Sequence, residues 1–201
     1  LFGISCININ ELKKAEFYFY KSLKILPNNI NALLGLWNIY DKEKNYEKLV
    51  DITHKLLIKR PKNNDLYVKL GNIYYIIKKY NLALKYFKKT LNTEVELVSL
   101  VKIAKIYFLK NNFDTSIKYL LNAHSKSSND PQICELLGRC YDRLGKGEKA
   151  RLFFKLMAKI EPDRPNGLHN IGMSYTLQGN IDKAKFYYEK ALDIDSNFPE
   201  S

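Results

Sequence analysis

The apolar and polar positions of this 201-residue chain recur with a fixed period. Five segments read apolar, then small (or Trp), then two further residues, then Tyr, and their tyrosines are 34, 33, 34 and 34 residues apart. Nine residues after each Tyr comes a small or apolar residue, and the residue four positions later is aromatic in three of the five segments. The tyrosines are Tyr40, Tyr74, Tyr107, Tyr141 and Tyr175. This period predicts an array of small structural units, not one compact domain.

The spacing and the residue types resemble the tetratricopeptide repeat (TPR), a helix–turn–helix unit of 34 residues. In the register of that family Tyr stands at position 11, small residues at 8 and 20, an aromatic residue at 24 and Pro at 32. Pro27, Pro61 and Pro162 occupy the last of these positions. The resemblance implies an all-α protein, a right-handed α-solenoid of about six stacked antiparallel helix pairs.

The register divides the chain into repeats that cover nearly all of it. We expect a partial first repeat at residues 1–29, in which Phe2, Gly3 and Cys6 remain from the first helix. Complete repeats follow at 30–63, 64–96, 97–130, 131–164 and 165–198, and residues 199–201 begin a truncated further unit or tail. The chain starts without Met and no polar capping helix follows the last repeat. We therefore expect the array to continue at both ends, and uncapped ends could self-associate.

Small residues at position 8 are expected to let the second helix of a repeat approach the first closely. Two departures stand in the repeat at 30–63, where Trp37 occupies position 8 and Thr53 occupies the aromatic position 24. The pair is expected to open or shift, with Gly35 as a compensating residue. The single 33-residue spacing arises near residues 93–96, where Pro is missing, and a local change of pitch is expected there.

The net charge of +12 invites a nucleic-acid or anionic-membrane partner. However, Lys (28), Asn (20) and Ile (19) all have AT-rich codons, so base composition accounts for much of the excess. The charge is about +3 in each of four successive repeats and negative in the last, without a local cluster. We therefore expect no dedicated nucleic-acid site. No apolar run approaches the ~18–20 residues of a membrane-spanning helix. The compartment is left open, with the cytoplasm as default.

No constellation of residues indicates catalysis, a metal or a cofactor. The three histidines lie far apart, His124 on a packing face and His169 on the face that lines the groove in this family. Cys134 and Cys140 are six residues apart and do not share a helix face, so they are interpreted as core residues. Gly145-Lys146-Gly147 is a turn between helices, without the strand that a phosphate-binding loop needs. We predict a protein that is not an enzyme.

The resemblance places the binding surface on the concave side, lined by first helices at positions 2, 5, 6, 9, 12 and 13. Those positions predict a mildly basic groove with aromatic and amide side chains. The residues predicted to contact a ligand are Asn38, Lys69, Asn72, Tyr75, Lys102, Lys105, Phe108 and Arg139. Amides would bond a peptide backbone and cations its carboxylates.

These observations favour a non-catalytic scaffold that binds an extended or acidic peptide, or a helix, of a partner protein. Two alternatives stay open. The dispersed positive charge could bind RNA or an anionic surface, and the array could be the docking or regulatory arm of an enzyme whose catalytic domain lies outside these residues.

Overall fold

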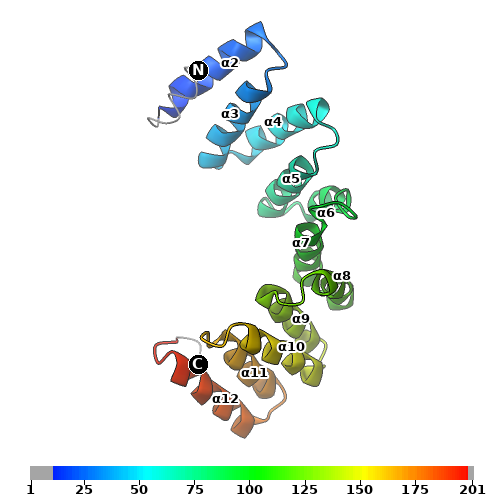
Figure 1. Ribbon diagram of the computed structural model, residues 1–201, viewed down its shortest axis with the longest axis vertical. Coiled ribbons are helices and arrows are strands. Elements are labelled where there is room, and N and C mark those ends of the chain that lie inside the picture. The colour runs from blue at the N-terminus through cyan, green and yellow to red at the C-terminus, as the bar shows by residue number, and fades with distance from the viewer. Residues whose placement is uncertain (1–10, 199–201) are drawn as a thin grey trace. The chain divides into compact units, whose positions relative to one another are not determined.

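The computed structural model describes residues 11–198, and within that range it contains eleven α-helices and no strand. The prediction of an all-α helical repeat fold is confirmed (Figure 1). The predicted first-helix remnant at Phe2, Gly3 and Cys6 lies outside the described residues, as does the tail at 199–201.

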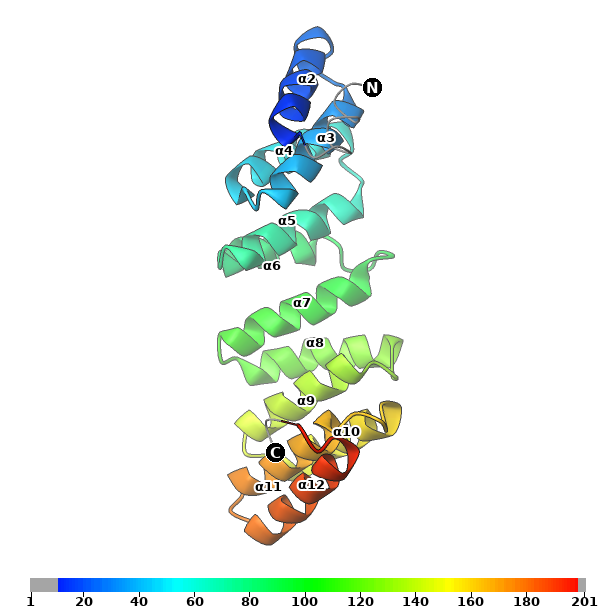
Figure 2. The same cartoon turned by 90° about the vertical axis from the view of Figure 1, so that its left-hand side faces the viewer.

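The chain divides into two compact halves, residues 1–95 and 96–201, which are described separately. The helices of the N-terminal half are α2 (Leu12–Ile25), α3 (Ile30–Lys42), α4 (Tyr46–Lys59), α5 (Asn64–Ile76) and α6 (Tyr80–Lys88). Those of the C-terminal half are α7 (Glu96–Leu109), α8 (Phe113–Lys126), α9 (Pro131–Arg143), α10 (Gly147–Ile160), α11 (Asn166–Leu177) and α12 (Ile181–Ile194). Within each half every helix packs against the next one in the chain, as α7 and α8 do in Figure 2.

The short connections between helices have a recurring local geometry. The five residues at position 15 of the predicted repeats all adopt a left-handed backbone conformation, with φ between 53° and 74°. They are Lys44, Lys78, Asn111, Gly145 and Gly179. The next helix often begins with an Asn cap, as at Asn45, where the side chain accepts a hydrogen bond from the Lys48 backbone N–H at 3.2 Å. Part of the asparagine excess therefore has a structural role at helix starts.

The small residue at position 8 makes room for the ring at position 24 of the same helix pair. A Cβ added at Gly138 would lie 2.3 Å from Phe154 Cε1, and one added at Gly71 would lie 2.6 Å from Phe87 Cε1. Both rings are almost wholly buried. The absence of a side chain lets each ring rest on the backbone of the first helix, so the two helices pack closely.

In the α3–α4 pair the large residue is at position 8 and the small residue at position 24, the reverse of the other pairs. The large residue Trp37 is on the first helix and the small residue Thr53 is on the second, and the indole Nε1 donates a hydrogen bond to Thr53 Oγ1 at 3.0 Å. Thr53 is fully buried and donates to the Leu49 carbonyl at 2.6 Å. The two departures therefore compensate for each other. Gly35, expected to compensate for Trp37, instead makes room for Phe19 of α2.

A second aromatic contact joins the helices of four pairs. The tyrosine at position 11 stacks on the aromatic residue twelve positions later, with ring centroids 5.5–5.7 Å apart. The stacked pairs are Tyr74–Tyr86, Tyr107–Tyr119, Tyr141–Phe153 and Tyr175–Tyr187. Offset stacks of this kind contribute about 0.5–1.5 kcal/mol beyond their buried area.

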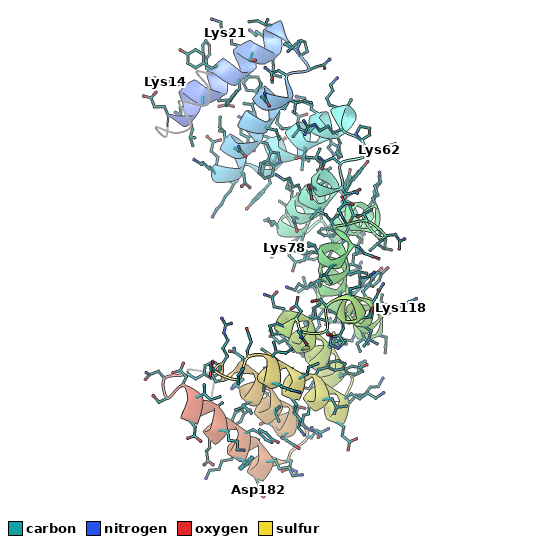
Figure 3. All side chains as sticks on the ribbon, viewed as in Figure 1. Lys14, Lys21, Lys62, Lys78, Lys118 and Asp182 are labelled. Carbon is teal, nitrogen blue, oxygen red and sulfur yellow. The ribbon has the colours of Figure 1, made fainter. Side chains whose placement is uncertain are left out.

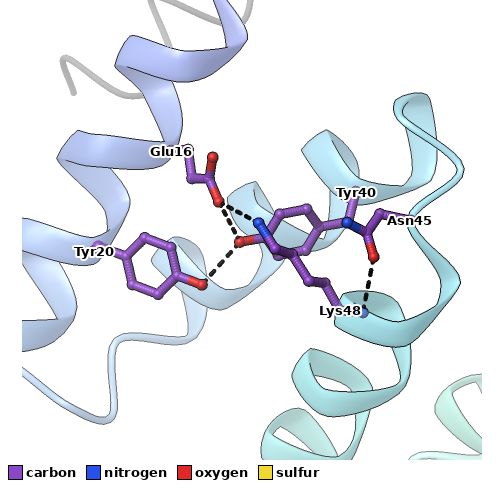
Figure 4. Close-up of polar contacts among 5 residues, drawn as sticks. All are labelled: Glu16, Tyr20, Tyr40, Asn45 and Lys48. Atoms are coloured by element: carbon purple, nitrogen blue, oxygen red, sulfur yellow. Dashed lines mark hydrogen bonds and ion pairs between the residues drawn. The ribbon is translucent and has the colours of Figure 1, made fainter.

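Tyr40 has no such partner, because position 23 of its repeat is Ile52, and it forms a polar network instead (Figure 4). Its hydroxyl donates to Glu16 Oε1 at 2.6 Å and lies 2.8 Å from the Tyr20 hydroxyl. Lys48 Nζ donates to the same Glu16 oxygen at 3.0 Å. The network ties α2, α3 and α4 together. The hydrogen bond from Tyr40, aided by Lys48, holds the pKa of Glu16 below its ordinary value.

The last helix of the N-terminal half is short. Helix α6 has nine residues, whereas α4 has fourteen. The chain then turns through residues 89–95, where Asn92 has a φ of 62° and Thr93 Oγ1 donates to the Thr90 carbonyl at 2.6 Å. This irregular segment lies where the spacing between successive repeats is 33 residues instead of 34.

The contact between positions 8 and 24 predicts the effect of Gly138→Ala. Alanine has the higher helix propensity by about 1 kcal/mol, so propensity alone would stabilise the protein. The buried Phe154 ring must move instead, and we expect the free energy of unfolding in urea to fall by about 1–3 kcal/mol. In a Phe154→Leu background the same change should cost clearly less. Equal costs in the two backgrounds would contradict the contact.

The Glu16 network predicts a pH-dependent contribution to stability. At pH 7 Glu16→Gln should lower the free energy of unfolding by about 1–3 kcal/mol, because charged hydrogen bonds are lost. The folded-state pKa of Glu16 lies below its ordinary 4.5. The contribution is therefore fully present above pH 4.5 and is lost as the pH falls through the folded-state value.

Urea midpoints of wild type and Glu16→Gln should converge at acidic pH. The matched control Glu47→Gln, at an exposed position of α4, should change the unfolding free energy by no more than about 0.5 kcal/mol at either pH. A difference between wild type and Glu16→Gln that stayed constant down to acidic pH would contradict this assignment.

Candidate functional site

The first helices of the C-terminal half form one connected surface. Helix α9 contacts both α7 and α11, in addition to the second helices beside it. Side chains at positions 2, 5, 6 and 9 of these first helices can therefore meet those of the neighbouring first helix. Lys105 on α7 and Arg139 on α9 are both predicted site residues, and the structure brings them to the same pocket.

That pocket has a volume of about 380 Å³ and a mainly polar lining. Three cations and two carboxylates line it, together with two amides and the buried apolar side chains Leu136 and Met157. Its charged residues are Lys105, Arg139, Arg164, Glu135 and Glu161, and its amides are Gln132 and Asn166. We call it the groove pocket.

Contacts within the groove pocket position its cations. The Arg139 guanidinium lies 5.3 Å from the ring centroid of Phe108, and its Nη1 is 3.5 Å from Glu135 Oε1. Arg164 Nη1 lies 3.5 Å from Glu161 Oε1. Phe108 in turn packs edge-on against Phe113, at 5.4 Å between centroids. Both ion pairs are long and partly exposed, so each is weak and can exchange with a ligand group.

Lys102, also predicted as a site residue, lies half-buried on α7. Burial lowers its pKa, and the nearby Lys105 lowers it further. Lys102, Lys105 and Arg139 thus lie on α7 and α9 of this half, and Glu135 and Glu161 balance part of their charge. That this surface binds an anion stays a prediction.

In the N-terminal half the structure places Lys69 against Trp37. The Lys69 Nζ lies 3.5 Å from the indole centroid, a cation–π contact. Burial lowers the pKa of Lys69, and Asp41 and Asp65 oppose that shift. Trp37 thus joins the predicted residues although position 8 is normally a packing position.

The other three predicted residues of this half differ in their accessibility. Asn38 is exposed on α3. On α5 the side-chain oxygen Oδ1 of Asn72 is buried and accepts no hydrogen bond from the residues that the structure describes. Tyr75 packs against Tyr80, with ring centroids 5.9 Å apart, and burial raises its pKa. These residues lie on two first helices, α3 and α5, that carry the groove positions of this half.

Some residues that line the groove pocket were not among the predicted site residues, and they lie at two kinds of position. Gln132, Glu135 and Asn166 occupy positions 2 and 5 of the register, so the same counting that found Arg139 could have found them. Glu161 and Arg164 lie in the connection between α10 and α11, at positions that are not among the groove positions of the register.

Two histidines of the C-terminal half pack against aromatic rings. His169, expected on the groove face, is 4% exposed and lies against Tyr188 and Phe198, each 5.4 Å away between ring centroids. His124 packs edge-on against Phe153, and its Nδ1 is buried without a hydrogen-bond partner among the described residues.

Cys134 and Cys140 are buried, and burial raises the pKa of both thiols, that of Cys134 to about 11. Both therefore remain protonated near neutral pH. Residues 11–198 contain no group of three or more His, Cys, Asp or Glu side chains arranged to hold a metal ion.

Much of the positive charge lies elsewhere, on side chains that point into solvent. Figure 3 shows Lys14 and Lys21 of the N-terminal half and Lys118 of the C-terminal half projecting away from their helices, and Lys62 projecting from the turn between α4 and α5. No helix of the described part of the chain is long and apolar enough to cross a bilayer.

Comparison with known proteins gives matches to family models, to curated proteins and to solved structures. Family models described as "Tetratricopeptide repeat" match residues 65–92 and 165–198. Tetratricopeptide repeat protein 8 of Caenorhabditis elegans is 23% identical over 169 residues, which is 83% of this chain and 33% of that protein. The human protein O-mannosyl-transferase TMTC1 is 20% identical over 192 residues, 93% of this chain and 22% of that protein. The chain thus spans a third or less of the length of these relatives.

Solved structures agree on the fold. The C-terminal part of a TPR repeat-containing protein from Cytophaga hutchinsonii superposes with a TM-score of 0.82 at 18% identity, covering 97% of this chain and 78% of that one. YrrB, described as "a TPR protein with an unusual peptide-binding site", superposes with a TM-score of 0.71 at 20% identity, covering 90% and 94%.

The recurring small–aromatic contact, the 34-residue period and these matches lead to one conclusion. The chain belongs to the tetratricopeptide repeat family, whose arrays act as protein-interaction scaffolds.

Proposed function

We propose that this chain is a non-catalytic scaffold that holds an extended, mainly acidic segment of a partner protein against its first helices. The observation that carries the proposal is the groove pocket, where Lys105, Arg139 and Arg164 converge around a volume of about 380 Å³. These three cations face two carboxylates, so the pocket retains a net positive charge.

The lining groups can recognise both the backbone and the side chains of such a segment. The Gln132 and Asn166 amides each offer donors and an acceptor, which match the N–H and C=O groups of an extended chain. Arg139 can exchange its 3.5 Å contact with Glu135 for a two-pronged contact with a ligand carboxylate. Leu136 and Met157, which also line the pocket, offer apolar surface to one ligand side chain.

The packing of Arg139 over Phe108 favours binding because it fixes part of the guanidinium's freedom before the ligand arrives. In the other half, the Lys69–Trp37 contact and the exposed Asn38 provide the same kinds of group. The description of YrrB as a TPR protein with a peptide-binding site supports the choice of a peptide as ligand.

A second candidate function is a docking arm within a longer enzyme. The likeness to TMTC1 supports it, because a named transferase contains a segment similar to almost the whole of this chain. In that case the groove pocket would hold a substrate protein or a regulatory segment, and the chemistry would belong to another part of the polypeptide.

Neutralising the groove pocket tests the proposal. Acidic peptides selected from a random library on the purified chain should bind Lys105→Gln/Arg139→Gln at least about tenfold more weakly than wild type. The reason is loss of the two cations that the pocket shares between α7 and α9. Fluorescence anisotropy at physiological salt measures the affinity, and circular dichroism checks that the helices are retained.

A matched control removes the same charge from other faces. Lys118→Gln/Lys159→Gln alters two exposed lysines outside the groove pocket and should leave the affinity within about twofold. Equal weakening in both variants would contradict the proposal, as would mixed-sequence RNA that binds wild type more tightly than any selected peptide at physiological salt.

A further inference from the structure

A buried arginine lies on the C-terminal half away from the groove pocket. Arg151 of α10 is 9% exposed. Its Nη1 donates hydrogen bonds to Gln178 Oε1 at 2.7 Å and to Ser174 Oγ at 3.3 Å. Its guanidinium carbon lies 4.1 Å from the Tyr175 ring centroid. These contacts hold the guanidinium between α10 and α11.

The charge of Arg151 is only partly compensated within the described residues. Its hydrogen bonds go to a hydroxyl and an amide, and no carboxylate among residues 11–198 forms an ion pair with it. The nearest acid in the network is Asp142, which accepts a hydrogen bond from Ser174 Oγ at 2.8 Å. Burial raises the pKa of Asp142, against the opposing effects of Ser174 and Arg151. A buried guanidinium stays charged, so a further anion beside it would be stabilising.

A pocket of about 370 Å³ opens beside this guanidinium. Arg151, Lys155 and Lys183 line it together with a single acid, Glu148. Its remaining lining residues are Leu152, Tyr175, Gln178 and Asn180. We call it the α10–α12 pocket. It shares no lining residue with the groove pocket, because its α10 residues lie on a different stripe of that helix.

Two further features concern the positive potential in this pocket: a helix N-terminus borders it, and an aromatic ring holds two of its cations nearby. Asn180 caps the start of α12, where its side chain accepts a hydrogen bond from the Lys183 N–H at 3.2 Å, so the N-terminal end of a 14-residue helix borders the pocket. Lys183 Nζ also lies 5.4 Å from the Tyr175 ring centroid. Tyr175 thus has the Arg151 and Lys183 cations near its ring, which keeps both close to the pocket.

We propose that the α10–α12 pocket binds a phosphate group carried on a side chain of a partner protein. A phosphate monoester has a charge of about −1.5 to −2 near pH 7, which matches three cations and one carboxylate. A buried guanidinium with further donors, two flexible ammonium groups and a tyrosine are side chains that recognise compact oxyanions. The site is independent of the proposed groove function.

The first experiment uses inorganic phosphate as the probe and the full chain labelled with ¹⁵N. At constant ionic strength, phosphate should shift the Gln178, Asn180 and Lys183 amide signals saturably, and at least about tenfold more tightly than acetate does. Lys155→Gln/Lys183→Gln should weaken this binding at least about tenfold. Arg151 itself is left unchanged, because its hydrogen bonds to α11 make it a structural residue as well.

The matched control is Lys159→Gln/Lys185→Gln, which removes two exposed lysines of the same helices outside the pocket. It should bind phosphate as wild type does. Equal weakening in both variants would overturn the proposal, as would shifts spread over all lysine-rich surfaces or phosphate binding no tighter than acetate.

The second experiment identifies the source of the phosphate. A phosphoserine peptide should bind more tightly than inorganic phosphate and at least about tenfold more tightly than its unphosphorylated form. A phosphopeptide that binds no better than free phosphate would overturn the partner-borne assignment. The Lys155→Gln/Lys183→Gln variant should still bind groove peptides normally, so failure here is distinguishable from failure of the groove proposal.

Discussion

The rest of the structure depends on one constraint within each helix pair. A small residue on one helix lies in close contact with a large side chain on the next. At Gly71 and Gly138 any Cβ would overlap the facing ring of Phe87 or Phe154. The contact fixes how near the two helices of a pair lie and which faces they present to each other. The groove positions then follow, because the first helix has only one face left for its polar side chains.

The same constraint explains which side chains lie at the predicted groove positions. In the α3–α4 pair the bulky residue is on the first helix, and Trp37 is consequently available to Lys69. In the C-terminal half the first helices lie next to each other, and Lys105, Arg139 and Glu135 meet in one pocket. The second helices carry a separate polar stripe, which with Arg151 and Lys183 forms the α10–α12 pocket. One repeat architecture therefore presents two chemically different surfaces.

Much of this arrangement could be predicted from the period, because each repeat position has one physical task. Register alone placed Lys105 and Arg139 on first helices. The stack between positions 11 and 23 was not predicted, although counting twelve residues on from each tyrosine would have found its aromatic partner. Register could not show that Trp37 and Thr53 compensate for each other, since that depends on a contact between side chains. Nor could it place His169, which Phe198 covers from a segment beyond α12. The burial of Arg151 likewise depends on partners 23 and 27 residues away.

The measurement that tests the central claim most directly is a double-mutant cycle at positions 37 and 53. Trp37→Gly should leave a cavity and Thr53→Phe should overpack the pair, so each alone should lower the free energy of unfolding by about 1–5 kcal/mol. Together they restore the arrangement seen at Gly71 and Phe87. The account predicts that the double variant is more stable than the sum of the single effects, by at least about 1 kcal/mol. Strictly additive effects in urea unfolding would contradict it.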